Sequence, residues 1–326
     1  MALVLVLWVI SLLTIMAGSF ALSMRREASI TAGIKNNAQA LAVAESGIAI
    51  AELMLLNPDQ NQRWRADGSI YEIIATDTKV RVRLLSEAGK VDINKADQVL
   101  LEALMSSVPS VAEQKSTLVA GILDWRDADD LVHTEGAEKN EYKAAGLSYQ
   151  PRNKPFQSLE ELQLVLGMNE ALFLQLEPLI TVYSGQPTVS VQQAAKEVLQ
   201  IIPGLDTSLI EAYMTARIDS AINDLATPLF PSSSDSGLAS ANVQPTTLGS
   251  NVLTLVSEAL LHDKSSAIIC VVIKKVDPVA MQSTTSPQNP FQVLKWQQVT
   301  THNRSLFVDA MNKLLVKQYA EPEFNH

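Results

Sequence analysis

The chain of 326 residues has a single cysteine, Cys270, which excludes both an internal disulfide and a metal site built from several thiolates. Cys270 lies in an apolar run, residues 267–273, and is interpreted as a small core residue. Basic residues are also scarce, because 25 Lys and Arg against 35 Asp and Glu give a net charge of −10. We therefore expect no nucleic-acid partner, since binding a phosphate backbone needs clustered Lys and Arg.

Catalytic motifs are missing as well. The four histidines lack the spacing of a metalloprotease, and the sequence has neither a Gly-x-Ser-x-Gly motif nor a glycine-rich phosphate loop. Paired carboxylates occur, but nothing beside them indicates a hydrolase. The sequence thus predicts a structural or binding protein and not an enzyme.

Charge is absent before Arg25, and residues 2–22 form a run of about twenty apolar or small residues. A helix of that length crosses the roughly 30 Å hydrocarbon core of a membrane. No basic start precedes the run and no small-residue cleavage boundary follows it, unlike in a secretory signal peptide. We therefore expect a retained membrane helix.

This helix is predicted to continue to about residue 56, because residues 25–56 contain no proline and Asn57-Pro58 is a plausible stop. An apolar stripe recurs every seven residues on its second half, at Ile34, Leu41, Ile48 and Leu55. The alternative is a membrane anchor followed by a separate amphipathic helix.

Position 5 of this helix is leucine, and the first acidic residue is Glu27. In a filament that bundles such helices, the terminal amine, here that of Met1, needs a carboxylate from a neighbouring helix because an unpaired buried charge is expensive. With Leu5, this chain can accept a neighbour's carboxylate but cannot supply one.

After residue 58 the pattern changes to strands, at residues 70–75, 79–84 and 90–93. The strict alternation of residues 79–84 predicts one buried and one solvated face. A helical block follows, with Asn94 as the N-cap of its first helix. Strands return at residues 252–256, 267–276 and 291–299, and a closing helix is expected at residues 303–318. One sheet interrupted by a helical insertion is therefore predicted.

The helical block contains a faint internal repeat. Residues 91–96 followed by Leu100 and Leu104 are similar to residues 189–194 followed by Val198 and Ile202. Each copy predicts a short extended segment, a cap and an amphipathic helix. Residues 156–179 predict a helix–turn–helix that is similar to a helix-hairpin-helix or SAM-like unit.

An acidic cluster is the densest polar feature of the sequence. Residues 124–141 hold seven carboxylates against Arg126 and Lys139, a local net charge of −5. Packing like charges so closely costs stability unless a cation neutralises them. Oxygen donors at irregular short spacing suit Ca²⁺, although this is no EF-hand because Leu131 and Val132 replace a ligand and the glycine. The alternative is a solvated acidic loop. From spacing we assign the ligands as Asp127, Asp129, Asp130, Glu135 and Glu138.

These features, in this order, resemble the minor pseudopilin K family of the bacterial type II secretion system, also called general secretion pathway protein K. The resemblance covers nearly the whole chain. It rests on the N-terminal helix with Leu5, on Val91-Asp92-Ile93-Asn94-Lys95-Ala96 and on the acidic segment from Asp124 to Tyr142. Residues 158–168 and 291–296 complete it.

The resemblance implies an α+β fold: a pilin-like long N-terminal helix plus an antiparallel sheet, with a large all-helical (SAM-like or helix-hairpin-helix-like) insertion. Four segments follow. Residues 1–57 form the transmembrane and amphipathic helix, 58–93 the first part of the sheet, 94–226 the helical insertion, and 227–326 a loop, the remaining strands and the C-terminal segment.

The role implied by the resemblance is structural, at the tip of a pseudopilus with the I, J and H minor pseudopilins. The inner-membrane platform of the secretion system, removal of a leader by prepilin peptidase and methylation of the new amine belong to the same expectation, as does structural calcium. The soluble part would lie in the periplasm. Arg25 and Arg26 follow the membrane segment, so this orientation needs opposing charge from a leader.

Two alternatives remain open. A membrane-anchored helix-hairpin-helix receptor for DNA uptake would need basic residues at the hairpin turns, and residues 165–168 and 202–204 have none beside them. A minor pilin of a type IV pilus or competence system shares the anchor but not the acidic cluster with its helical insertion.

Overall fold

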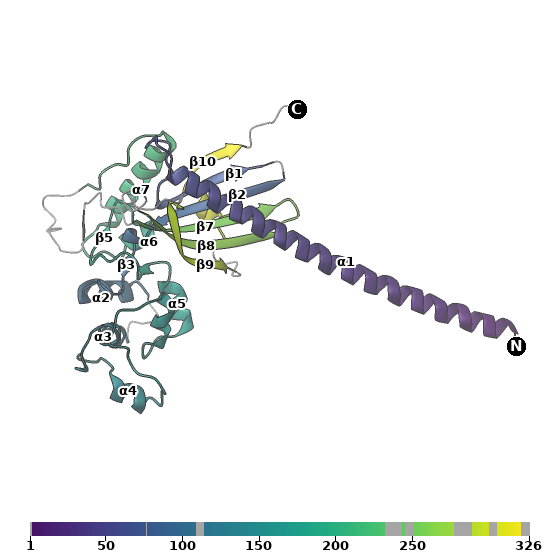
Figure 1. The fold of residues 1–326 in the computed structure, drawn as a ribbon, viewed down its shortest axis with the longest axis horizontal. Coiled ribbons are helices and arrows are strands. Elements are labelled where there is room, and N and C mark those ends of the chain that lie inside the picture. The colour runs from purple at the N-terminus through teal and green to yellow at the C-terminus, as the bar shows by residue number, and fades with distance from the viewer. Residues whose placement is uncertain are drawn as a thin grey trace.

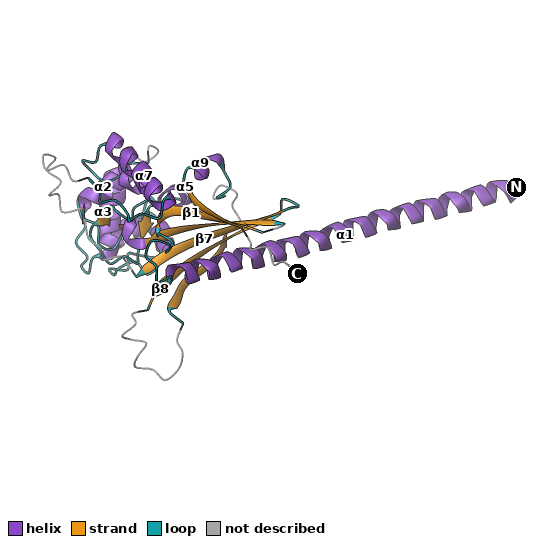
Figure 2. Ribbon diagram, turned by 90° about the horizontal axis from the view of Figure 1, so that it is seen from above, coloured by secondary structure: helices purple, strands orange, loops and turns teal. Residues whose placement is uncertain are grey.

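The computed structural model describes residues 2–75, 77–108, 114–231, 243–244, 251–276, 289–299 and 305–320. Its longest element is α1 (Ala2–Leu55), one helix of 54 residues whose first half extends away from the globular part (Figures 1 and 2). The continuous helix expected from the sequence is present. The alternative of an anchor followed by a separate helix is wrong.

A six-stranded sheet forms the centre of the globular part, in the order β10-β1-β2-β7-β8-β9. Its strands are β1 (Asp67–Ile74), β2 (Thr78–Ser86), β7 (Val252–Leu261), β8 (Ser266–Lys275), β9 (Phe291–Val299) and β10 (Leu315–Ala320). All neighbours are antiparallel except β10, which runs parallel to β1. The predicted α+β class with one interrupted sheet is confirmed.

The second half of α1 packs on one face of this sheet, mainly over β2, β7 and β8. Its buried residues are mostly small, which lets the helix axis approach the strands closely: Ala40, Ala44, Gly47, Ile48, Ala51 and Leu55. Gly47 is required at the crossing point, because a Cβ there would lie 2.7 Å from Cγ1 of Val80. Val80, Val82 and Leu84 supply the facing side of this core.

The opposite face of β2 is not solvated, contrary to the prediction from its alternation. Arg81 is only 8% exposed, and its Nε lies 2.6 Å from Oε2 of Glu72 on β1. Its guanidinium also donates to the main-chain oxygen of Leu306, at 2.8 Å. The C-terminal segment covers this face at Arg81, and so this arginine is paired instead of hydrated.

That C-terminal segment is also not the helix expected at residues 303–318. Within residues 305–320, only α9 (Asp309–Asn312) is helical, and β10 follows it. Pairing of β10 with β1 satisfies the backbone of an otherwise open edge, which a periodicity argument on one segment cannot detect. Of the predicted loops, 226–250 and 277–290, most residues lie outside the described ranges.

The helical insertion enters the chain between β2 and β7 and lies at one end of the sheet (Figure 1). Its helices are α2 (Gln98–Ser106), α3 (Lys115–Arg126), α4 (Lys139–Ala144), α5 (Glu170–Leu176), α6 (Lys196–Leu199) and α7 (Thr207–Ile222). Short 3-10 helices span Glu87–Gly89 and Leu159–Leu164. Two small parallel pairs join β3 (Val91–Asp92) to β4 (Ile180–Thr181) and β5 (Val189–Ser190) to β6 (Val243–Gln244). Its core is separate from that of the sheet.

The internal repeat is present in the structure. In each copy a two-residue strand leads into a turn and then a helix, β3 into α2 and β5 into α6. The main-chain oxygen of Asp92 accepts from Ala96 N at 2.8 Å, and that of Ser190 accepts from Ala194 N at 2.9 Å. The second helix is shorter than the amphipathic helix expected through Val198 and Ile202: only Lys196–Leu199 are α-helical.

Asn94 does not cap α2, contrary to expectation. Asp97 is the N-cap, and its Oδ1 accepts from Leu100 N at 2.8 Å. Asn94 instead clamps a distant segment: its Nδ2 donates to Phe156 O at 2.9 Å and its Oδ1 accepts from Phe156 N at 2.7 Å. A side chain that satisfies both polar groups of a distant residue fixes that segment against β3.

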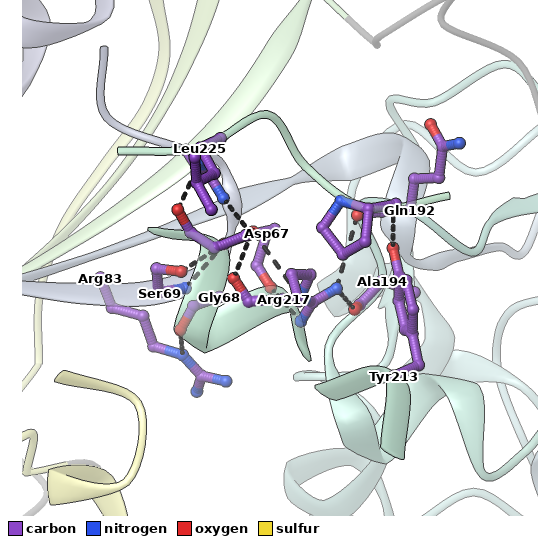
Figure 3. A network of polar contacts seen from close by, with 12 residues as sticks. Asp67, Gly68, Ser69, Arg83, Gln192, Ala194, Tyr213, Arg217 and Leu225 are labelled. Atoms are coloured by element: carbon purple, nitrogen blue, oxygen red, sulfur yellow. Dashed lines mark hydrogen bonds and ion pairs between the residues drawn. The ribbon is translucent and has the colours of Figure 1, made fainter. Parts of the chain in front are cut away.

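A buried polar network joins the insertion to the sheet (Figure 3). Arg217 on α7 is 2% exposed and donates to Asp67 O at 2.7 Å, while its Nε lies 3.6 Å from Oδ2 of Asp67. Arg65 adds a bond of 2.8 Å to Oγ of Ser220. These contacts fix the insertion to the start of β1.

Candidate functional site

The acidic cluster lies on the part of the helical insertion farthest from the sheet, where α3 ends and a loop leads to α4 (Figure 1). Trp125 at the end of α3 is buried and stacks on Phe156, with ring centroids 5.9 Å apart. Tyr142 on α4 packs against the same indole. The two ends of the loop are therefore held by one aromatic core, which determines where its carboxylates can lie.

Asp124 organises this loop from inside. It is fully buried, and its carboxylate accepts from His133 N at 3.1 Å, from Ala137 N at 2.7 Å and from the His133 ring. Gly136 permits the close approach, because a Cβ there would collide with the Asp124 carboxylate. One side chain thus satisfies three donors spread over the loop, and the loop folds around a buried negative charge.

Two further carboxylates have buried oxygens without a hydrogen-bond partner within the described residues: Oδ1 of Asp127 and Oε1 of Glu138. Potential ligand atoms of Asp124, Asp127 and His133 lie within 4.8 Å of one another. Burial, followed by the charges of Asp124 and Asp127, raises the pKa of Glu138 to about 7. Burial and the neighbouring Asp129 also raise the pKa of Asp127. The site therefore concentrates negative charge that its own hydrogen bonds do not compensate.

The arginine within the cluster does not neutralise it. Arg126 turns away and donates to the main-chain oxygens of Ile93 and Ala96, each at 2.6 Å. Burial lowers the pKa of this guanidinium, and the nearby Asp92 and Asp127 oppose that effect. Arg126 thus stabilises the turn of the first repeat and does not neutralise the carboxylates of the loop.

The five predicted ligands are divided by the structure. Asp127 and Glu138 lie at the buried site. Asp129 and Asp130 are exposed beside it, where Oδ1 of Asp129 accepts from Leu131 N at 2.9 Å and Oδ1 of Asp130 accepts from Asn153 Nδ2 at 2.8 Å. Their charges contribute to the raised pKa of Glu138. Glu135 is exposed and has a positive φ of 66°. Of the five predicted ligands, only Asp127 belongs to the group formed with Asp124 and His133.

Sequence reasoning missed Asp124 and His133. Asp124 precedes Asp127 by three residues at the end of a helix, a spacing that places both on one side, and this signal was available. The spacing of the histidines excludes a metalloprotease and assigns His133 no role, yet its ring contacts the Asp124 carboxylate. Buried carboxylate oxygens without donors match the chemistry of a hard divalent cation such as Ca²⁺. An imidazole nitrogen is a poor ligand for that ion, and here it is already engaged by Asp124.

The second candidate site is the exposed half of α1. This helix is long and apolar enough to cross a membrane, and no residue of its most apolar part is buried within the structure. Leu5 and Ile34 are about two-thirds exposed, whereas Ile48 and Leu55 are buried against the sheet and Leu41 is half-buried. The predicted stripe is therefore divided between the core and the exterior. Met1 lies outside the described residues.

Comparisons with known proteins agree with one another. The family model "Type II secretion system (T2SS), protein K" matches residues 79–185. Type II secretion system protein K of Klebsiella pneumoniae is 28% identical over 199 residues, which are 55% of this chain and 61% of that protein. That of Pectobacterium carotovorum subsp. carotovorum is 27% identical over 77 residues, 24% of each chain. The match thus spans less than two thirds of either relative.

The fold is also similar to a chain in the crystal structure of the GspK-GspI-GspJ complex from the enterotoxigenic Escherichia coli type 2 secretion system. The TM-score is 0.53 at 18% identity, over 83% of this chain and 99% of that chain. At this identity the likeness concerns the fold alone. In sequence and in fold the chain is thus similar to type II secretion system protein K, and the family model matches about a third of it, residues 79–185.

Proposed function

We propose that this chain is a structural minor pseudopilin that caps the tip of the type II secretion pseudopilus and helps initiate its assembly. The assembled system would export folded proteins from the periplasm across the outer membrane. The chain would be anchored by α1 in the inner membrane, with its sheet and insertion in the periplasm. The I, J and H minor pseudopilins, the inner-membrane platform and prepilin peptidase would be its partners.

The observation that carries this proposal is the form of α1. Its first half exposes apolar side chains on all sides, as a helix must in lipid or in a bundle of like helices. The helix holds no carboxylate before Glu27. A terminal subunit has no neighbour ahead whose amine needs a carboxylate, so Leu5 costs nothing at the tip.

The insertion supports the same place in the assembly. It lies at the end of the sheet away from the exposed half of α1 and widens the molecule there (Figures 1 and 2). A shaft that repeats one subunit along closely packed helices has little room for such a projection. At the tip the projection is unobstructed.

We further propose that the acidic loop holds structural calcium, with Asp127 and Glu138 as its inner ligands and Asp129 and Asp130 beside them. The unpartnered buried oxygens of Asp127 and Glu138 support this assignment. A bound divalent cation would offset the buried charge of Asp124 and neutralise the carboxylates that now raise the pKa of Glu138. Calcium would then stabilise the loop and carry no chemistry.

A receptor for DNA is supported less well. The arginines of the two repeats, Arg126 and Arg217, donate to main-chain oxygens inside the protein and do not point to solvent. Neither is free to bind a phosphate. The cluster of carboxylates on the outer part of the insertion would repel a nucleic acid.

The test is co-assembly of the full chain with its I and J counterparts from the same source, expressed together and extracted in a mild detergent. Size-exclusion chromatography with light scattering should show one copy of each subunit in a defined complex. A filament built from this chain alone would contradict the tip position. Separate monomers at micromolar concentrations would contradict the partnership.

A further inference from the structure

Strand β9 is an edge strand with unusually little protection. It ends the sheet next to β8, and within the described residues no strand pairs with its other side. Of its nine residues only Phe291 is buried, and the large apolar side chains of Val293, Leu294 and Trp296 are 48%, 36% and 49% exposed. Edge strands are usually blunted by charge, by proline or by short length, because their free N–H and C=O groups invite another strand.

The charge on β9 does not provide that protection. Lys295 is the one charged residue of the strand, and its Nζ binds Oε1 of Glu160 in the helical insertion at 2.5 Å. The contact with the carboxylate raises the pKa of Lys295 despite its partial burial. The ammonium is thus held at the insertion in an ion pair, and this one lysine opposes an incoming strand only where it meets a like charge.

Two of the exposed apolar side chains of β9 continue the face of the sheet that α1 covers. Trp296 pairs with Val271, and Val293 pairs with Ile273, and both partners belong to the core under α1. Cross-strand partners share one face of a sheet, so Trp296 and Val293 continue that apolar face beyond the edge of the helix. The exposed surface therefore borders the helix through which the proposed assembly forms.

From this placement we infer that the outer edge of β9 accepts an extended strand from a neighbouring pilin-like subunit. The inference rests on the proposed function. A subunit that packs its own long helix along α1 brings its globular part to this flank. Val293 and Trp296 lie on one face because the register between β8 and β9 shifts between Val272 and Ile273. Main-chain hydrogen bonds to β9 would give affinity, and apolar side chains of the added strand on that face would cover Val293 and Trp296.

A second copy of this chain fits the edge less well. Lys295 is the middle residue of residues 291–299, so antiparallel pairing of two β9 strands over their full length places Lys295 opposite Lys295. Like charges directly opposite each other destabilise a strand pair. A partner strand that is uncharged at this position has no such conflict.

Amide hydrogen exchange of the full chain in detergent, alone and with its I and J counterparts, tests the inference. In the complex, exchange at about half of the amides in 291–299 should slow by at least tenfold, because alternate residues direct their N–H groups outward. A complex with unchanged exchange in 291–299 would overturn the inference and leave the proposed function standing. If no complex forms, the β9 inference and the proposed function are both contradicted.

A substitution supplies the second arm. Trp296→Lys should weaken assembly at least tenfold, because a lysine at the edge opposes strand addition. Val99→Lys, at a comparably exposed site on α2, should leave assembly unchanged. Equal weakening by both variants would overturn the inference. Slowed exchange in 291–299 on raising the concentration of the chain alone would identify a second copy as the occupant and would also overturn it.

Discussion

Arg126 and Arg217 hold equivalent positions in the two repeats of the helical insertion. Arg126 donates to Ala96 O at 2.6 Å, and Arg217 donates to Ala194 O at 2.8 Å. The two alanines occupy the same place in the turn that follows β3 and β5. Each arginine therefore satisfies carbonyl groups of its own turn, and the repeat extends from the strands to the helices α3 and α7.

The repeats differ in what surrounds this arginine. Two residues before Arg126 lies Asp124, which organises the acidic loop, whereas two residues before Arg217 lies Thr215, whose hydroxyl donates to Glu211 O at 2.9 Å. The second repeat instead directs its arginine to Asp67 of the sheet. One copy thus carries the charged loop, and the other carries the attachment to the sheet.

Replacing Arg217 by methionine should destabilise the chain strongly. Asp67 is 4% exposed, and loss of its cation leaves a buried carboxylate uncompensated, which costs about 3–5 kcal/mol. Arg126→Met is the matched control, because Arg126 bonds to carbonyl groups and forms no direct ion pair with an acid within the described residues, and about 1–3 kcal/mol is expected. Urea unfolding of the full chain in detergent measures both. Equal losses would contradict the assigned role of Asp67.

Gly47 gives a prediction about the contact between α1 and the sheet. Gly47→Ala should cost about 1–3 kcal/mol, because the added methyl group meets Val80 and the hydroxyl of Ser257. Gly33→Ala is the control on the same helix, with nothing within 4 Å, and should stabilise by about 0.5–1 kcal/mol. Fluorescence of the buried Trp64 during unfolding measures the difference. A gain in stability from both substitutions would contradict the close packing of α1 on the sheet at Gly47.

The sequence was sufficient for the elements whose pattern is local. The long helix, the central strands and the two repeats follow from periodicity and from short motifs. Asn94 and the C-terminal segment do not, because their partners, Phe156 and β1, are distant in sequence. Arg81 likewise lies at a position that the alternation of β2 predicts to be exposed. It is buried because the segment around Leu306 covers it.

The acidic site shows the same limit. Its net charge and its place between two helices are visible in the sequence. Which carboxylates turn inward depends on the aromatic core formed by Trp125, Tyr142 and Phe156. Spacing alone predicts Glu135 and Glu138 equally as ligands. In the structure Glu135 is exposed, whereas Glu138 is buried, with 3% of its surface accessible.

Glu258 predicts how stability depends on pH. It is 3% exposed, and burial raises its pKa above the ordinary 4.5, against bonds from Ser305 and Leu306 N. A carboxyl whose pKa is raised by folding binds its proton more tightly in the folded state. The free energy of unfolding therefore falls as the pH rises above about 4.5.

Glu258→Gln should remove this contribution. Relative to that variant, the parent chain should lose stability as the pH rises from about 4 to about 8, as measured by thermal unfolding across that range. Glu102→Gln, at a half-buried position on α2 in the insertion, serves as the control and should run parallel to the parent. If the parent chain instead gains stability relative to Glu258→Gln as the pH rises, the pKa of Glu258 is lowered by folding and the prediction is wrong.

Calcium should stabilise the folded chain if the acidic loop holds it. A ligand that binds the folded state, present at about 100 times its dissociation constant, adds about 2.7 kcal/mol to the free energy of unfolding. A chelator should remove this gain. Asp127→Asn and Glu138→Gln should each abolish most of the calcium-dependent shift in Tm, because these side chains carry the unpartnered buried oxygens.

Glu135→Gln separates a built site from a diffuse attraction of cations to negative charge. It removes one charge from the same loop, yet Glu135 is exposed and, unlike Glu138, has no buried oxygen without a partner, so the calcium-dependent shift in Tm should remain. A loss equal to that in Asp127→Asn would mean that total charge and not geometry attracts the ion. Without calcium, Glu138→Gln should stabilise the chain, because it removes a buried acid from beside Asp124 and Asp127. The same substitution is thus expected to change sign with calcium, which a purely structural role for Glu138 would not produce.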